Sequence, residues 1–169
     1  MKTVNLELVQ KTRYDVQAMI DAMNPQEKAQ LSADWFARFR ASTTADPWVH
    51  GFSAQHRESG AIVGTGMFKA PPADGVVEIA YGIAVDHRGN GYATEIAGAL
   101  VGYAFSFNEI KVVRAHTLPD SSASQRILAK CGFEHVGEFN DPEDGLVWRF
   151  EMRRATGEIE PEGDITASV

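Results

Sequence analysis

The residues best suited to chemistry form one stretch between positions 85 and 94, which reads Val-Asp-His-Arg-Gly-Asn-Gly-Tyr-Ala-Thr. Gly89 and Gly91 allow a tight turn and let the backbone approach a ligand closely. The apolar spacing after them is that of a helix, whose first backbone N–H groups have no partner inside the helix. Together with the helix dipole these groups favour a bound anion, and Arg88 adds positive charge. The stretch therefore predicts a loop that binds phosphate.

Other phosphate-binding motifs share these features but fit the sequence less well. A P-loop needs Gly-Lys followed by Ser or Thr after its loop, and this triplet is missing here. A dinucleotide-binding fingerprint has a third glycine or an alanine where this chain has Thr94. That fingerprint also normally opens a strand–helix–strand repeat, whereas antiparallel strands are expected before this loop. A glycine-rich turn that only reverses the chain is the simplest alternative.

Hydrophobic periodicity and turn residues predict the elements that must hold this loop. Alternating apolar residues predict a first strand over Val4 to Leu8. Thr12 is a suitable N-cap for a first helix, and Asn24-Pro25 marks the start of a second helix. The second helix is expected to present its apolar side chains as one core-facing side up to Phe39. The pair Asp46-Pro47 ends this helical region.

The rest of the chain predicts six more strands and two helices. Three strands with short, turn-rich connectors favour an antiparallel meander, at Trp48 to Gln55, Ile62 to Lys69 and Val76 to Val85. After them we expect a helix over Gly91 to Phe107, a strand over Val112 to Thr117, a helix over Ser121 to Lys130, and a final strand pair at Phe133 to Glu138 and Val147 to Met152. The sum is an α+β fold with a mixed, mostly antiparallel sheet flanked by helices.

Three motifs resemble the GNAT superfamily of N-acetyltransferases. The pattern Arg-x-x-Gly-x-Ala at positions 88 to 93 resembles its acyl-CoA pyrophosphate loop, and residues 78 to 83 resemble the strand before that loop. Residues 119 to 133 resemble its later helix, where Ser-x-Arg-x-Leu at 124 to 128 is similar to the ribosomal-protein N-terminal acetyltransferase (RimJ/RimL-like) branch. The resemblance spans residues 3 to 153. It implies a GNAT fold whose splayed central strands hold acyl-CoA.

The resemblance also implies which residues bind acyl-CoA. The expected set comes from the strand end, the loop and the later helix: Ile83, Ala84, Val85, Arg88, Gly89, Asn90, Gly91, Tyr92, Ala93, Thr94, Ser121 and Arg126. A backbone N–H around Ile83 to Val85 would polarise the thioester carbonyl. Two positions depart from the family pattern. Ser121 stands where the branch usually has Asn, and Leu128 stands where many members place a Tyr as general acid.

Glu78 and Ser124 are the expected catalytic residues. Glu78 is a charged residue inside an apolar run, at the position from which many relatives draw a carboxylate base, and partial burial would make it a better base. Ser124 matches the serine proposed to stand near the CoA sulfur, where a hydroxyl could protonate the departing thiolate. The alternatives are a Glu78 that points to solvent and a Ser124 that bonds to its own helix backbone. Tyr81 is expected on the strand face opposite Glu78, in packing or in the wall of the pantetheine tunnel.

Bulk properties exclude several other classes. A length of 169 residues suits a single domain, here 1–154, followed by an acidic tail over 155–169 that is expected to be disordered. The net charge of −7 argues against nucleic acid, and no apolar run is long enough to span a membrane. The single cysteine, Cys131, excludes a disulfide framework, and no His or Cys spacing indicates a metal site. A cytoplasmic location follows by default.

Together these features predict an N-acyltransferase that uses acetyl-CoA, or another short acyl-CoA, to acylate a primary amine. The first expected acceptor is a protein N-terminal α-amine, and a small-molecule amine is the second. The transfer is expected by direct attack in a ternary complex without a metal. Relatives are often dimers, so a homodimer is possible. A CoA-binding sensor or structural subunit without catalysis is the alternative function, and a nucleotide-binding protein is the third option.

Overall fold

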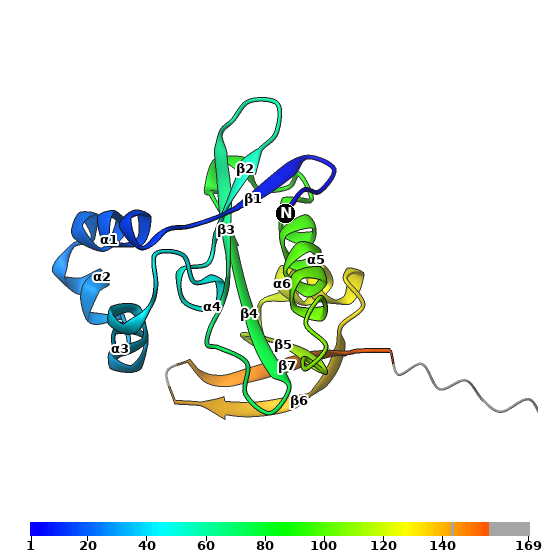
Figure 1. Ribbon diagram of the computed structural model, residues 1–169. Coiled ribbons are helices and arrows are strands. Elements are labelled where there is room, and N and C mark those ends of the chain that lie inside the picture. Colours follow the sequence, from blue (N-terminus) through cyan, green and yellow to red (C-terminus); the bar gives the residue numbers. More distant parts are fainter. Residues whose placement is uncertain (143, 156–169) are drawn as a thin grey trace, which may run out of the picture.

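The structure is a computed structural model that describes residues 1–142 and 144–155, so the predicted acidic tail lies outside the described residues from position 156 onward. A seven-stranded sheet separates two helical layers (Figure 1). The strands are β1 (Leu6–Gln10), β2 (Phe52–His56), β3 (Ile62–Phe68), β4 (Val76–Ile83), β5 (Val112–Thr117), β6 (Glu134–Asp141) and β7 (Gly145–Arg153). Helices α5 (Tyr92–Phe105) and α6 (Ser122–Lys130) lie on one side, and α1 (Arg13–Ala22), α2 (Pro25–Ala29) and α3 (Ala33–Ala41) on the other. The short helix α4 (Pro47–His50) contacts both layers, because Trp48 packs against Tyr103 of α5 and Val49 against the other helices. Within the described residues, no helix is long and apolar enough to cross a membrane.

The sheet is antiparallel except at its centre, which confirms the predicted mixed, mostly antiparallel architecture. The strand order is β1-β2-β3-β4-β5-β7-β6, and only β4 and β5 pair in parallel. That parallel pairing ends with Glu78 opposite Arg114. Beyond it β4 continues to Ile83 and β5 to Thr117, so their ends are no longer hydrogen-bonded to each other. We call the space between these unpaired ends the wedge.

Helix α5 positions the loop that precedes it by packing closely on the sheet. Its inner side is fully apolar and includes Ile96 and Leu100, which are completely buried. Gly66 of β3 lies beneath it, where a Cβ would stand 2.8 Å from Ile96 Cγ2 and 3.1 Å from Leu100 Cδ1. Since real Cβ contacts essentially never fall below 3.0 Å, the contact with Ile96 shows that glycine at this position lets α5 lie against the sheet.

Two expectations for the first third of the chain were wrong in detail. The second helix is split, because Ser32 accepts a hydrogen bond from Trp35 N at 3.1 Å and starts a new helix, α3. The strand expected from Trp48 starts only at Phe52. The residues before it form α4, since Asp46 accepts a hydrogen bond from Trp48 N and proline occupies the first helical position.

Helices α1, α3 and α4 build a small apolar cluster of their own, separate from the main core. Its buried members are Val16, Ile20, Phe39 and Val49. Trp35 stacks on Phe39 with ring centroids 5.4 Å apart, so the aromatic side of α3 is used for packing, as expected. This layer covers the sheet on the side away from α5 (Figure 1).

His50 ties this layer together through both of its ring nitrogens. Asp46 N–H donates to Nδ1 at 3.1 Å, so Nδ1 is the accepting nitrogen. Nε2 then carries the proton and donates to Ser42 Oγ at 2.8 Å, and the Ser42 hydroxyl donates to Phe39 O at 2.7 Å. This arrangement requires a neutral imidazole. Burial lowers the pKa of His50, as does Arg13, and together they outweigh Asp46.

The stability of the protein is therefore expected to fall in weakly acidic solution. An unfolded histidine titrates near pH 6.5, and above that pH His50 is neutral in both states, so its contribution is complete. As the pH falls from that value toward the lower folded-state pKa, the unfolded chain binds the proton first and stability is lost. Urea unfolding at about pH 7.5 and about pH 5.5 should show a smaller loss for His50→Gln than for the wild type. His87→Gln is the control and should keep the wild-type loss; an equal loss in both variants would contradict the assignment.

Candidate active site

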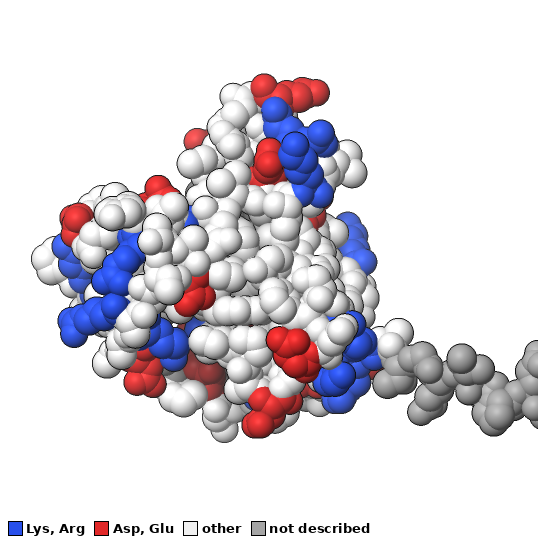
Figure 2. Space-filling model, in the orientation of Figure 1, with Lys and Arg blue, Asp and Glu red and all other residues white. Residues whose placement is uncertain are grey.

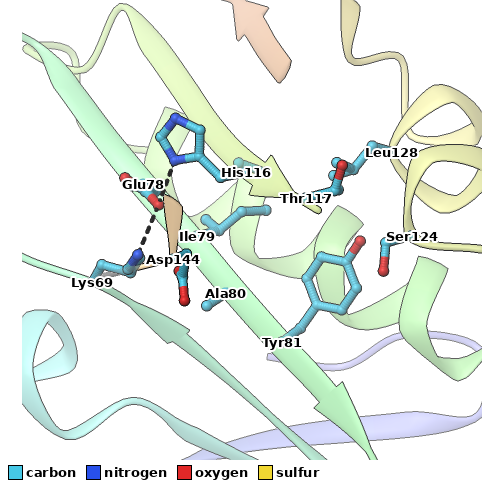
Figure 3. Close-up of a pocket in the computed structure, with 11 residues that line it drawn as sticks. Lys69, Glu78, Ile79, Ala80, Tyr81, His116, Thr117, Ser124, Leu128 and Asp144 are labelled. Atoms are coloured by element: carbon cyan, nitrogen blue, oxygen red, sulfur yellow. Dashed lines mark hydrogen bonds and ion pairs between the residues drawn. The ribbon is translucent and has the colours of Figure 1, made fainter. Parts of the chain in front are cut away.

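A pocket of about 190 Å³ lies at the wedge and brings the two expected catalytic residues together. Its lining comes from both central strands, from α6 and from two flanking turns: Lys69, Glu78, Ile79, Ala80, Tyr81, Ala115, His116, Thr117, Ser124, Leu128 and Asp144 (Figure 3). Glu78 stands at the last paired position of β4, where the strands begin to separate. Ser124 reaches the same pocket from the first turns of α6.

The pocket has a charged side and a hydroxyl side. Side chains alternate along each strand, so Glu78 and His116 share one face of the sheet, while Tyr81 and Thr117 belong to the other. Figure 3 shows Tyr81 directed toward Ser124, and Glu78 directed toward His116 and Lys69. Tyr81 lies on the sheet face opposite Glu78, as expected. Both residues still line one pocket, because β4 and β5 separate beyond Glu78 and the pocket opens to both faces of the sheet.

On the charged side, Glu78 is held by two neighbours. Its Oε1 lies 2.9 Å from His116 Nδ1 and 3.3 Å from Lys69 Nζ, and its side chain is 24% exposed. Burial by itself would lower the pKa of Lys69, but Glu78, Asp141 and Asp144 outweigh it and raise that pKa. Glu78 is thus a partly buried, oriented carboxylate with an ammonium group beside it, which argues against a side chain free in solvent.

On the hydroxyl side, three of the lining residues carry a hydroxyl group. Burial raises the pKa of the Tyr81 phenol, so it stays protonated and can donate a hydrogen bond. Thr117 Oγ1 is buried and has no hydrogen-bond partner within the described chain. Ser124 also makes no hydrogen bond to any described residue, so its hydroxyl is not used by the backbone of α6. The hydroxyls of Tyr81 and Ser124 therefore line the pocket, while that of Thr117 lies buried behind its surface.

The backbone of β4 also presents groups to the wedge. Lys69 N donates to Glu78 O and Ala84 N donates to Val63 O, both at 2.9 Å. In an antiparallel ladder alternate residues bond to the same neighbour, so the N–H groups of Tyr81 and Ile83 point away from β3, toward the wedge. Of the three residues expected to offer a carbonyl-binding N–H, Ile83 has the suitable direction. The Ala84 N–H is used within the sheet.

The glycine-rich loop joins the end of β4 to α5 and is open at its glycines. Val85 begins a short 3-10 turn, after which Gly89 and Gly91 adopt φ values of +80° and +78°. A Cβ at either glycine would meet no atom within 4 Å, so both positions face open space. Asn90 Nδ2 donates to His87 O at 3.0 Å and to Arg88 O at 3.3 Å, which fixes the loop internally.

The start of α5 can accept an anion, and this supports the fit of an acyl-CoA. Gly91 is the N-cap of α5 and has no side chain that could accept a hydrogen bond. The backbone N–H groups of the first turn therefore receive no side-chain cap from it; they belong to Tyr92, Ala93 and Thr94. The helix is 14 residues long. Arg88 is exposed beside the loop, where its Nε donates to Ile83 O at 3.4 Å. The chain's own groups thus offer a phosphate cradle at the mouth of the wedge.

The two expected CoA-binding residues at α6, Ser121 and Arg126, are not among the residues that line the pocket. Ser121 is the N-cap of α6, but its side chain makes no capping hydrogen bond to the described residues. Arg126 is exposed on α6 and does not belong to the pocket lining. Cys131, at the end of the helix, lies close to Thr94 O with an Sγ–O distance of 3.6 Å, and burial raises the pKa of its thiol. That environment suits packing.

Sequence reasoning missed five polar residues around the site, and only one had a readable signal. Lys69, Thr117 and Arg149 lie in predicted strands and Asp144 in a connecting segment, but no motif in the sequence marks any of them as part of a site. His116 was recognisable in principle, because Arg114 and His116 alternate with small or apolar residues in a predicted strand, which indicates one polar face. Its contact with Glu78, 38 positions away, depends on the parallel register and could not be read from spacing.

The acidic composition is distributed over the surface. On the face shown in Figure 2, Lys and Arg side chains are interspersed with Asp and Glu among the described residues. Basic groups lie over the α1–α3 layer and also at the upper and lower right of this view, and the centre of the face is largely uncharged (Figure 2).

A family model, curated relatives and solved structures all relate this chain to the GNAT acetyltransferases. Residues 5–134 match the model of the acetyltransferase (GNAT) domain. The chain is 34% identical over 72 residues to the uncharacterized N-acetyltransferase YjdG of Bacillus subtilis, covering 43% of each chain. It is 32% identical over 84 residues to YoaA of the same organism, covering 49% of this chain and 48% of that protein. The chain thus spans about half the length of the curated relatives it matches.

Solved structures share the fold over most of their length. A GNAT-family acetyltransferase from Bacillus anthracis matches with a TM-score of 0.66 at 17% identity, covering 90% of this chain and 97% of that one. The Vibrio cholerae spermidine N-acetyltransferase in complex with CoA and spermine matches with a TM-score of 0.63 at 16% identity, covering 88% and 95%. The aminoglycoside acetyltransferase AAC(6')-Ib in complex with coenzyme A and kanamycin matches with a TM-score of 0.62 at 20% identity, again covering 88% and 95%. Since the family model matches well over half of the sequence and the sheet matches these structures, the chain has the GNAT fold and belongs to the GNAT acetyltransferase family.

Proposed function

We propose that this protein is an acyl-CoA-dependent N-acyltransferase that transfers an acetyl or other short acyl group to a primary amine. The observation that carries the proposal is the pocket at the wedge, with the Glu78 carboxylate on one side and the Ser124 hydroxyl on the other. The uncapped start of α5 supports a donor with a pyrophosphate group. The family match supports the same donor.

The residues of the wedge have separate roles in this proposal. Bound acyl-CoA would supply the acyl group as a thioester. Glu78 accepts the proton of the amine, because about one-third of an α-amine and about one part in a thousand of a lysine amine is neutral near physiological pH. The Ile83 N–H is the candidate donor to a carbonyl oxygen. Ser124 is the candidate donor to a departing thiolate, and the protonated Tyr81 stands beside it.

The acceptor we favour is the α-amine of a protein N-terminus, and a small cationic amine is second. The resemblance of residues 124 to 128 to the RimJ/RimL-like branch supports the first. Asp141, Asp144 and Glu78 lie near Lys69 at the charged side of the pocket and would attract a protonated amine of either kind. The spermidine and aminoglycoside enzymes of the same fold act on small cationic amines, which supports the second.

An acceptor screen tests the proposal directly. Acetyl-CoA is incubated with the protein and with a peptide that has a free N-terminus, the same peptide N-acetylated, a lysine peptide and a polyamine, and free thiol is measured. We expect thiol release with the free N-terminal peptide above that with its N-acetylated form. CoA binding by calorimetry without turnover on any acceptor would favour the alternative of a CoA-binding sensor.

Lys69 is expected to compete with a cationic acceptor for Glu78. Its ammonium lies 3.3 Å from Glu78 Oε1, and its side chain is 37% exposed. Lys69→Met keeps most of the aliphatic stem and removes the charge, so the KM for a cationic amine should fall roughly two- to fivefold, as befits a solvent-screened ion pair. Lys28→Met, on exposed α2, is the control and should leave KM unchanged. A higher KM in Lys69→Met would mean that Lys69 helps to build the acceptor site.

A further inference from the structure

His116 is bonded on both sides of its ring by groups of opposite character. On one side, Arg149 Nε donates to His116 Nε2 at 2.9 Å. On the other, His116 Nδ1 lies 2.9 Å from Glu78 Oε1. The imidazole side chain is only 11% exposed, so water competes little for either nitrogen. Arg149, His116 and Glu78 thus form a continuous chain that runs from β7 through β5 to β4.

The chemistry of arginine determines where the imidazole proton lies. A guanidinium group only donates hydrogen bonds, so Nε2 of His116 must accept and carries no proton. The single ring proton is then on Nδ1, and the Nδ1–H group donates to the Glu78 carboxylate. The ring is neutral in this arrangement. Because both nitrogens are occupied, His116 is not itself free to take a proton from an amine.

We propose that His116 is a positioning residue for Glu78, held by Arg149 as the neutral Nδ1–H tautomer. The proposal rests on the proposed function, in which Glu78 is the general base. His116 and Lys69 both engage Oε1, which leaves Oε2 for the incoming amine. A neutral donor orients the carboxylate without adding a second cation to Lys69, whereas an imidazolium at the same distance would form a further ion pair and weaken the base.

Arg149 is well fixed for this task. It stands directly opposite His116 in the β5–β7 pairing. Its guanidinium lies over the Phe139 ring, 3.5 Å from the centroid. Arg114, which lies beside Glu78 in the β4–β5 register, is bound to Glu151 at 2.7 Å and so is engaged elsewhere. Arg149 can therefore hold the imidazole of His116, while Arg114 is neutralised by Glu151.

The imidazole proton can be observed without any substrate. In nitrogen-15 spectra of the full-length protein, at a pH where the ring is neutral, His116 should show the proton on Nδ1. Arg149→Met should abolish this fixed tautomer, while Arg153→Met, an exposed arginine on the same strand, should leave it intact. An Nε2-bound proton in the wild type would overturn the proposal, whatever the enzymatic activity of the protein.

Kinetics of three variants complete the test. His116→Asn keeps an N–H donor close to the position of Nδ1, and should retain kcat/KM within about threefold, whereas His116→Leu should lose roughly 10- to 100-fold with unchanged CoA affinity. Arg149→Met should show an intermediate loss. Equal activity of the Asn and Leu variants would overturn the positioning role. If the tautomer is as expected but Glu78→Gln retains full turnover, it is the proposed function of Glu78 that fails, together with any role for His116 in orienting a base.

Discussion

Glu78→Gln is expected to lower kcat by roughly 100- to 10,000-fold, which is the usual contribution of a positioned general base. Gln has nearly the same shape as Glu, and its carbonyl oxygen can still accept the hydrogen bond that His116 Nδ1 gives to Oε1. The variant therefore removes the charge and the proton acceptor while keeping the packing of the wedge. CoA affinity should remain within about twofold of the wild-type value, because Glu78 lies on the side of the sheet away from α5.

The pH dependence of this variant distinguishes loss of a base from general damage. Without a base the reaction depends on the fraction of amine that is already neutral, so the rate of Glu78→Gln should rise about tenfold per pH unit below the amine pKa. With an N-terminal α-amine this rise should level off near pH 8, and with a lysine amine it should continue to about pH 10. Glu109 is an exposed carboxylate that does not line the pocket, so Glu109→Gln is the matched control and should behave as the wild type. Unchanged turnover in Glu78→Gln would remove Glu78 from the mechanism.

Local sequence patterns were sufficient to predict most of the strands and the helices α1, α5 and α6, because the apolar periodicity and the flanking turn or capping residues of each lie within its own segment. Strand β5 has the expected bounds, Val112–Thr117, since β-branched residues and a turn on each side define it. The errors arose where two local signals competed. Trp48 and Val49 are apolar residues typical of a strand, but the cap by Asp46 and the proline after it fold them into α4.

Residues of the candidate site could be predicted only where they belong to a sequence motif. Glu78 and Ser124 were predicted through the resemblance, and the structure brings both to one pocket. The polar face that carries His116 was recognisable, but its contacts with Glu78 and Arg149 could not be predicted, because they join β4 to β5 and β5 to β7. Strand register decides those contacts, and a shift of one residue would direct each side chain to the other face of the sheet. A single sequence carries little information about register.

Gly91→Trp is expected to weaken CoA binding by at least about 100-fold, since losing two charge-assisted hydrogen bonds to phosphate has about that effect. Gly91 has φ +78°, and its missing Cβ faces open space at the start of α5. An indole there would fill the space in front of the N–H groups of the first helical turn, where we expect the pyrophosphate. Calorimetry with CoA measures the loss directly, and wild-type affinity in this variant would show that the donor binds elsewhere.

Gly91→Trp changes the backbone preference at a positive φ and also fills the space in front of the helix. Gly91→Ala separates these two effects, because it changes the backbone preference with little added volume. An alanine at positive φ costs about 1–2 kcal/mol of stability but leaves most of the space in front of the helix open. It should therefore destabilise the protein in urea unfolding while weakening CoA binding much less than the Trp variant. Gly102→Ala, within α5 at a position where a Cβ meets no atom within 4 Å, is the control and should raise the unfolding free energy by about 0.5–1 kcal/mol with CoA affinity unchanged. If Gly91→Ala and Gly91→Trp weakened binding equally, the backbone conformation of the loop, and not the open space before it, would control the affinity for the donor.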